Sequence, residues 1–246
     1  MTKKELTSVA VVLVVLAIVL HGIHILIFGD PHHVAIYGFG DIAFLPVEIL
    51  VISLVVDRVL KEREREAIRD KMNMVVGTFF NAIGRRLLDR LPKMLENRED
   101  VLPSLALRPD WKAPQIRTAC KAGETLRMKI RPEPEDLEQL RDLLNEERDF
   151  LLRLLENPIL LERDEFTELL WAISHLQEEL EARGDLRALP ESDFHHLSGD
   201  VNRLFTHLVR EWLEHMPHLN ARYPFLYSFA ARTNPLRPDA DVTVRE

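Results

Sequence analysis

The sequence is poor in cysteine and has no excess of positive charge, and both shortages exclude whole classes of function. Its 246 residues contain a single cysteine, Cys120. An intrachain disulfide framework and a cysteine-based zinc cluster within one chain are therefore excluded, and a reducing compartment is favoured. The formal net charge is −8, whereas binding to nucleic-acid phosphates requires a concentrated basic face. We expect no nucleic acid as a main partner.

The usual sequence signatures of catalysis are also missing. No G-x-S-x-G nucleophile elbow occurs, and the nine glycines are scattered along the chain. The stretch YGFGD at 37–41 does not open a helix after a strand, as a dinucleotide-binding motif does. Cys120 stands in a proline-bounded segment with no histidine near it in the sequence. We therefore predict a non-enzymatic protein without a cofactor.

Histidine, a residue that often binds metals, is in contrast frequent in this sequence. Six of the ten histidines fall beyond residue 170, and these are His175, His195, His196, His207, His215 and His218. Helical spacing gathers four polar residues on one flank, namely His196, Asp200, Arg203 and His207. Helical di-metal proteins instead use paired Glu-x-x-His motifs that point inward, and no such pair occurs here. We interpret the flank as a solvated or interhelical polar face and predict no bound metal.

Long apolar runs are concentrated in the first sixty residues. Val9 to Phe28 contains twenty residues without a formal charge, which as a helix would span about 30 Å, the thickness of a bilayer's hydrocarbon core. Lys3 and Lys4 precede the run, as in a signal peptide. The run nevertheless exceeds the usual h-region of ~7–15 residues and no A-x-A cleavage site follows. We expect an uncleaved transmembrane helix.

A second apolar stretch, residues 34–56, is interrupted by Asp41 and Glu48. A single helix that starts near Asp41 and runs through Leu60 has the length to cross a bilayer. Asp41 would then act as an N-cap or lie at the outer interface, with Pro46 tolerated near the first turn. The alternative is a buried helical hairpin in a soluble protein.

The distribution of positive residues predicts the orientation. Lys3 and Lys4 precede the first span, and residues 29–41 contain no Lys or Arg. Six cations follow the second span within residues 58–71, namely Arg58, Lys61, Arg63, Arg65, Arg69 and Lys71. The positive-inside rule therefore predicts a multi-pass protein of the inner (cytoplasmic) membrane with both termini in the cytoplasm.

Polar residues within the hairpin form a candidate membrane site. In an antiparallel hairpin that turns near residues 30–33, His21 and His24 fall near the depth of Asp41. Glu48 lies about two turns deeper. A carboxylate near hydrocarbon is costly, so it should face protein or water. We favour a polar contact that orients the helices over a proton or ion site or interfacial exposure.

Residues 61–97 predict an amphipathic helix that continues from the second span without a break. Apolar residues recur three or four positions apart from Ile68 to Leu91. The stripe includes Met72, Val75, Phe79 and Ile83, and the small residues Gly77 and Gly84 would let another helix approach. The partner could be the same helix of a second subunit or the downstream domain. We favour a self-associating, coiled-coil-like stalk.

Residues 98–134 are predicted to form a proline-rich irregular connector, with at most a short strand or helix around 116–130. Residues 135–246 are predicted to form a helical bundle. Three amphipathic helices are expected in the bundle, over 137–155, over 165–182 and from an N-cap at Ser192. Pro217 and Pro224 should end the third helix. Together with a transmembrane hairpin over 1–60, these segments make an all-α fold.

The terminal stretch of the bundle contains aromatic and basic residues that could dock a partner, namely Arg222, Tyr223, Phe225, Tyr227 and Arg232. We favour the alternative that this stretch covers the bundle core.

Three stretches together, VEILVISLVVDRVLKERE, KMNMVVGTFFNAIGRRLL and HMPHLNARYPFLYSFAARTNPL, resemble an uncharacterised family of prokaryotic two-span membrane proteins. The resemblance covers Pro46 to about Pro238. It implies a membrane hairpin with a cytoplasmic helical domain, and it implies no activity. Ser-Glu commonly stands in that family where Asn81-Ala82 stands here, which weakens any role for an acid at that position.

These patterns favour a membrane-anchored, oligomeric interaction or signalling module that binds lipid and an unknown cytoplasmic protein. The alternative is a small oligomeric ion or proton channel that uses Glu48. An enzyme ranks third.

Overall fold

The computed structural model describes residues 3–243 and confirms the all-α class. Within that range the chain forms helices and, outside them, a single isolated β-bridge between Leu95 and Ile130. The chain divides into a hairpin unit, Met1–Arg65, and a C-terminal unit, Glu66–Glu246.

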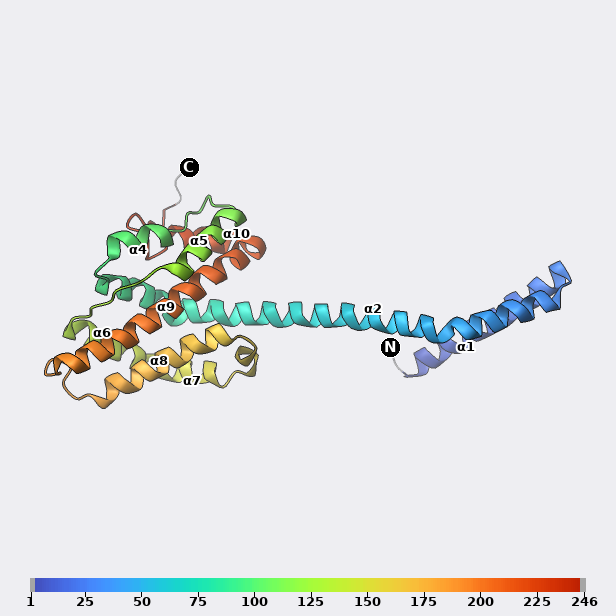
Figure 1. Cartoon of the computed structure of the whole chain (residues 1–246), viewed down its shortest axis with the longest axis horizontal. Coiled ribbons are helices and arrows are strands. Elements are labelled where there is room, and N and C mark those ends of the chain that lie inside the picture. The colour runs from blue at the N-terminus through green and yellow to red at the C-terminus, as the bar shows by residue number, and fades with distance from the viewer. Residues whose placement is uncertain (1–2, 244–246) are drawn as a thin grey trace. The chain divides into compact units, whose positions relative to one another are not determined.

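The hairpin unit consists of α1 (Lys3–Phe28) and the first part of α2 (Pro31–Phe79) (Figure 1). Gly29 joins them with a φ of 65°, in the left-handed region that glycine adopts without strain. The Asp30 carboxylate accepts a hydrogen bond of 3.0 Å from the backbone N–H of His33, and proline follows at the first position of α2. This combination of an aspartate cap and a first-turn proline starts a helix.

The start of α2 corrects one sequence prediction. The second helix was expected to begin near Asp41, whereas it begins at Pro31, so that Asp30 and not Asp41 caps it. Asp41 therefore lies inside the helix, and Pro46 is an interior proline rather than a first-turn residue.

Beyond α2 the helical path continues through a π-helical turn (Phe80–Gly84), α3 (Arg85–Arg90) and a 3₁₀ turn (Leu91–Met94). The apolar stripe of this path is covered by its own chain. Phe79 is buried with its ring 5.3 Å from that of Phe166, and Phe80 lies 5.0 Å from Trp212.

This burial corrects the predicted stalk interface. Met72, Phe79 and Ile83 are buried, Gly84 is buried as well, and Val75 and Gly77 are half-buried. The stripe therefore packs into the core of the C-terminal unit, together with buried residues of the downstream helices. The downstream domain, the second of the two partners considered, is the one that covers it.

The segment expected to be an irregular connector contains two helices, α4 (Arg98–Leu105) and α5 (Ala113–Thr125). Leu105, Leu107 and Ile116 are fully buried in the same core as the bundle. The five prolines of 98–134 stand at helix starts, within α4 or in the loops, and so they delimit short helices without preventing them.

The remaining helices are α6 (Pro134–Glu146), α7 (Arg148–Leu155), a 3₁₀ turn (Pro158–Glu162), α8 (Asp164–Ala182), α9 (Glu191–Arg222) and α10 (Pro224–Arg232). The predicted helix 165–182 is confirmed as α8, and the predicted helix 137–155 is interrupted at Glu147. Figure 1 shows α8 lying along α9, with which it is in contact.

Two predictions about α9 are wrong. Pro190 rather than Ser192 precedes its first turn, and Pro217 lies inside the helix instead of ending it. A proline at 217 removes the amide that would donate to the carbonyl of Leu213. The thiol of Cys120 on α5 donates to that oxygen instead, at 3.2 Å.

Candidate functional site

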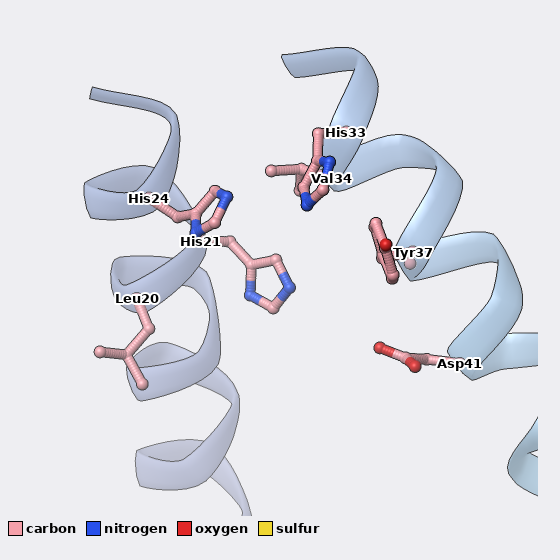
Figure 2. Close-up of a pocket in the computed structure, with 8 residues that line it drawn as sticks. Leu20, His21, His24, His33, Val34, Tyr37 and Asp41 are labelled. Atoms are coloured by element: carbon pink, nitrogen blue, oxygen red, sulfur yellow. The ribbon is translucent and has the colours of Figure 1, made fainter. Parts of the chain in front are cut away.

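A polar pocket lies between α1 and α2 near the turn of the hairpin. It encloses about 320 Å³ and is lined by Leu20, His21, His24, His33, Val34, Tyr37, Gly38 and Asp41. The His24 and His33 rings are nearly parallel, with centroids 5.9 Å apart, and the His33 and Tyr37 rings lie 4.4 Å apart. Figure 2 shows His21, Tyr37 and Asp41 directed into the space between the two helices.

The spacing of these residues along each helix explains the pocket. His21 and His24 stand three positions apart on α1, whereas His33, Tyr37 and Asp41 stand four apart on α2, and both spacings share a helix face. The structure brings together His21, His24 and Asp41 as the hairpin prediction expected. Sequence reasoning missed His33 and Tyr37, although the four-residue steps from His33 to Tyr37 and from Tyr37 to Asp41 were the available signal.

Glu48 does not line this pocket. Its side chain is exposed on α2. The structure therefore separates the four predicted membrane residues into a group of three and an isolated glutamate.

A second concentration of titratable groups is buried inside the C-terminal unit. Glu211 on α9 is fully buried, and its carboxylate lies 2.8 Å from Nη2 of Arg163. Burial raises the pKa of Glu211 to about 7, opposed by Arg163 and reinforced by Glu214 and Glu165. One turn later, burial lowers the pKa of His215 to about 4, helped by the nearby His218 and Arg163.

A third group joins α8 to α9. His175 Nε2 lies 3.5 Å and His196 Nε2 lies 3.4 Å from Oδ2 of the buried Asp200. Of the flank predicted from the sequence, Arg203 joins this group through Oδ1 of Asp200, at 3.2 Å. His207 does not, because it faces Glu168 at 3.6 Å. His175, His196 and Asp200 each offer one ligand atom, and these three atoms lie within 4.8 Å of one another. Imidazole nitrogen and carboxylate oxygen are ligands that transition metals accept.

Comparison with known proteins identifies the family. The model of the C-terminal helical domain of uncharacterized protein MJ1433 matches residues 68–232, and that of its N-terminal helical domain matches residues 2–60. The chain belongs to the MJ1433 family. Uncharacterized protein MJ1433 of Methanocaldococcus jannaschii is 39% identical over 233 residues, which cover 95% of this chain and 94% of that protein. No solved structure matches.

The MJ1433 family match confirms the resemblance to an uncharacterised family. Its two matched regions lie on either side of residues 61–67, within which the structure also separates the hairpin unit from the C-terminal unit. The membrane part of the resemblance stays a prediction.

The predicted docking residues of this MJ1433 family member divide into two groups. Tyr227 is buried and its hydroxyl donates to the carbonyl of Arg108 at 2.9 Å, and the Arg232 guanidinium donates to the carbonyl of Val242. These two side chains are therefore part of the folded unit. Tyr223 and Phe225, in contrast, are exposed, beside the exposed Arg222 that faces Asp70 at 3.6 Å.

Proposed function

We propose that the protein is a membrane-anchored, non-enzymatic interaction or signalling module. In this proposal the hairpin unit spans the inner membrane and the C-terminal unit carries the interaction surfaces in the cytoplasm. The observation that carries the proposal is the exposure of the apolar windows of α1 and α2, in which no residue is buried. A core helix of a soluble protein would be covered by its own chain, whereas these side chains require lipid or a partner.

The positive residues support the orientation. Six cations stand between residues 58 and 71, and none occurs between residues 29 and 41, which favours a cytoplasmic C-terminal unit.

Labelling of single cysteines tests this topology. Cys120→Ala removes the native thiol, and Asp30→Cys or Glu99→Cys then places one thiol in the hairpin turn or on α4. A membrane-impermeant maleimide should label Asp30→Cys in intact cells, and Glu99→Cys only after permeabilisation. Labelling of both in intact cells, or release of the chain from membranes by alkaline carbonate, would contradict the proposal.

Self-association is part of the proposal, and exposed aromatic rings on α10 supply a surface for it. Phe225 is 70% exposed, and Phe229 beside it is 43% exposed. Exposed aromatic side chains of this kind are typical anchors of protein interfaces.

Native mass spectrometry of the full chain in detergent measures the subunit number. The wild type should give a mass of two or more chains, and replacing both Phe225 and Phe229 by serine should shift it to one. Trp171→Ser is the matched control, because Trp171 is 62% exposed on α8, and it should leave the mass unchanged. A monomeric wild type would exclude self-association.

The polar pocket favours a second candidate, a small oligomeric ion or proton channel. Three histidines, a tyrosine and an aspartate line one pocket of the hairpin unit, and polar groups at membrane depth often mark ion paths. Glu48 would extend the path. Purified protein in liposomes should then conduct protons or cations, and Asp41→Asn and Glu48→Gln should reduce the flux without changing the native mass. Absence of flux from the wild type would exclude this candidate.

A further inference from the structure

The Asp200 carboxylate is buried, and its oxygen Oδ2 accepts no hydrogen bond from the residues that the structure describes. The side chain is 3% exposed, and Oδ1 faces Nη1 of Arg203 at 3.2 Å. Oδ2 itself is enclosed. Burying a carboxylate oxygen without a hydrogen-bond partner costs free energy, so a ligand bound to this atom would stabilise the folded state.

Two imidazoles are directed at that oxygen from two helices. His175 on α8 and His196 on α9 place their Nε2 atoms 3.5 and 3.4 Å from Oδ2, and the three ligand atoms all lie within 4.8 Å of one another. Around a tetrahedral ion with bonds of about 2.0–2.1 Å, neighbouring ligand atoms stand about 3.3 Å apart. The two measured separations are close to that value.

The backbone supports this geometry. His196 and Asp200 are four residues apart and share one face of α9, and α8 packs directly on α9. The side chains of His175 and His196 are 44% and 52% exposed, so an ion can enter from solvent while Asp200 is held beneath.

The surrounding charges are balanced. Arg203 holds Oδ1 of Asp200, which leaves Oδ2 for the ion. Glu179 Oε2 lies 3.6 Å from His196 Nε2 and is itself held by Arg183 at 2.5 Å. Arg183 is shared between Glu179 and Asp193, at 2.5 and 2.6 Å, so these three side chains together carry one negative charge, which offsets the cation Arg203.

We propose that His175, His196 and Asp200 bind a divalent transition-metal ion of the zinc type, with water in the fourth position. Two imidazoles and one carboxylate suit zinc and similar ions rather than magnesium or calcium, which prefer oxygen ligands alone. The bound ion would join α8 to α9 and thereby stabilise the C-terminal unit. This site is independent of the membrane function proposed above.

Calorimetric titration with zinc tests the site. The full chain carries a tag without histidine, is purified in detergent and is stripped with a chelator. We expect one ion per chain, a higher melting temperature with zinc, and the intense visible bands of tetrahedral cobalt when cobalt replaces zinc.

The decisive variants each replace one of the two exposed histidine ligands. His175→Ala and His196→Ala should each weaken zinc binding by about tenfold or more, since even the loss of an outer-shell partner has effects of that size. His195→Ala is the matched control, because His195 is the exposed neighbour of His196 on α9 and lies outside the ligand group. It should retain the wild-type affinity and the cobalt bands. Circular dichroism verifies the helical content of each variant.

Three results would overturn the proposal. They are the absence of zinc binding by the wild type, unchanged affinity in His175→Ala or His196→Ala, and an equal loss in His195→Ala. In any of these cases the group is a set of ion pairs between two imidazoles and a carboxylate.

Discussion

The thiol of Cys120 on α5 donates a hydrogen bond to the carbonyl oxygen of Leu213 on α9, with an Sγ to O distance of 3.2 Å. Pro217 leaves that oxygen without its helical donor. A proline that should have ended α9 is thus accommodated by a side chain from another helix. The single cysteine of the chain therefore has a structural role.

This relationship predicts that Cys120→Ala destabilises the C-terminal unit by about 1 kcal/mol, because a buried carbonyl loses its partner. Pro217→Ala restores a backbone donor, so Cys120→Ala should cost less in that background. All three tryptophans, Trp111, Trp171 and Trp212, lie in the C-terminal unit, and their fluorescence during unfolding of the full chain in detergent measures the effect. Equal costs in both backgrounds would contradict the coupling.

Gly77 and Gly84 provide a matched pair on the buried stripe. A β-carbon on Gly77 would first meet the His215 ring at 3.6 Å, an ordinary contact, whereas one on Gly84 would lie 2.5 Å from the buried Phe80 ring. Gly77→Ala should stabilise the unit by about 0.5–1 kcal/mol through helix propensity, and Gly84→Ala should destabilise it by about 1–3 kcal/mol through overpacking. Tryptophan fluorescence during denaturation measures both. Similar effects of the two substitutions would contradict the packing described.

The raised pKa of Glu211 predicts that the folded C-terminal unit loses stability as the pH rises. Burial raises its folded pKa to about 7 from an ordinary 4.5, so the folded state disfavours the charged form. Its stabilising effect is fully present below pH 4.5 and is lost as the pH rises through about 7. Glu211→Gln should remove about 1–3 kcal/mol of this pH dependence. Parallel pH profiles of the wild type and the variant would refute the assignment.

The lowered pKa of His215 predicts that the folded C-terminal unit loses stability as the pH falls. Burial lowers its folded pKa from 6.5 to about 4, with further effects from His218 and Arg163. Its contribution is therefore present above pH 6.5 and is lost as the pH falls toward 4. His215→Leu should flatten the decline of the melting temperature between pH 6.5 and 4, whereas the control His195→Leu, on the exposed side of α9, should not. An equally steep decline in both variants would contradict the role of His215.

Tyr227 and Tyr223 differ in burial and in bonding. The Tyr227 hydroxyl donates to the Arg108 carbonyl, and burial raises the pKa of this phenol to about 12. Tyr227→Phe should cost about 1 kcal/mol, because a part-buried hydrogen bond is lost. Tyr223→Phe is the control at an exposed ring and should leave unfolding unchanged. If Tyr227→Phe left unfolding equally unchanged, the hydrogen bond of the Tyr227 hydroxyl would make no contribution to stability.

Local patterns predicted many of the helices but fewer of their ends. The apolar spacing of Phe166, Leu169 and Ile173 sufficed for α8, because a helix with one apolar face leaves a regular signal. Pro217 misled the prediction for α9, since the donor that compensates for it comes from α5, 93 positions away in sequence. The start of α2 differs from the prediction although Asp30-Pro31 is a local signal, because the length needed for one span was counted from Asp41.

The polar pocket was partly predictable for the same reason. A hairpin brings His21, His24 and Asp41 to one level through chain geometry alone. The His175–Asp200 contact was not predictable, since spacing along α9 indicates a shared flank but not which residue of α8 faces it.

The sequence by itself determined the all-α class, the two long apolar helices and the continuation of α2 beyond the hairpin. These features depend on local composition and on hydrophobic periodicity within a single helix. Tertiary structure alone decided that the stripe from Met72 to Ile83 packs inside its own chain, and that Asp200 lies beneath two imidazoles. Periodicity shows that an apolar face or a carboxylate needs a partner, but the identity of that partner depends on contacts between distant segments.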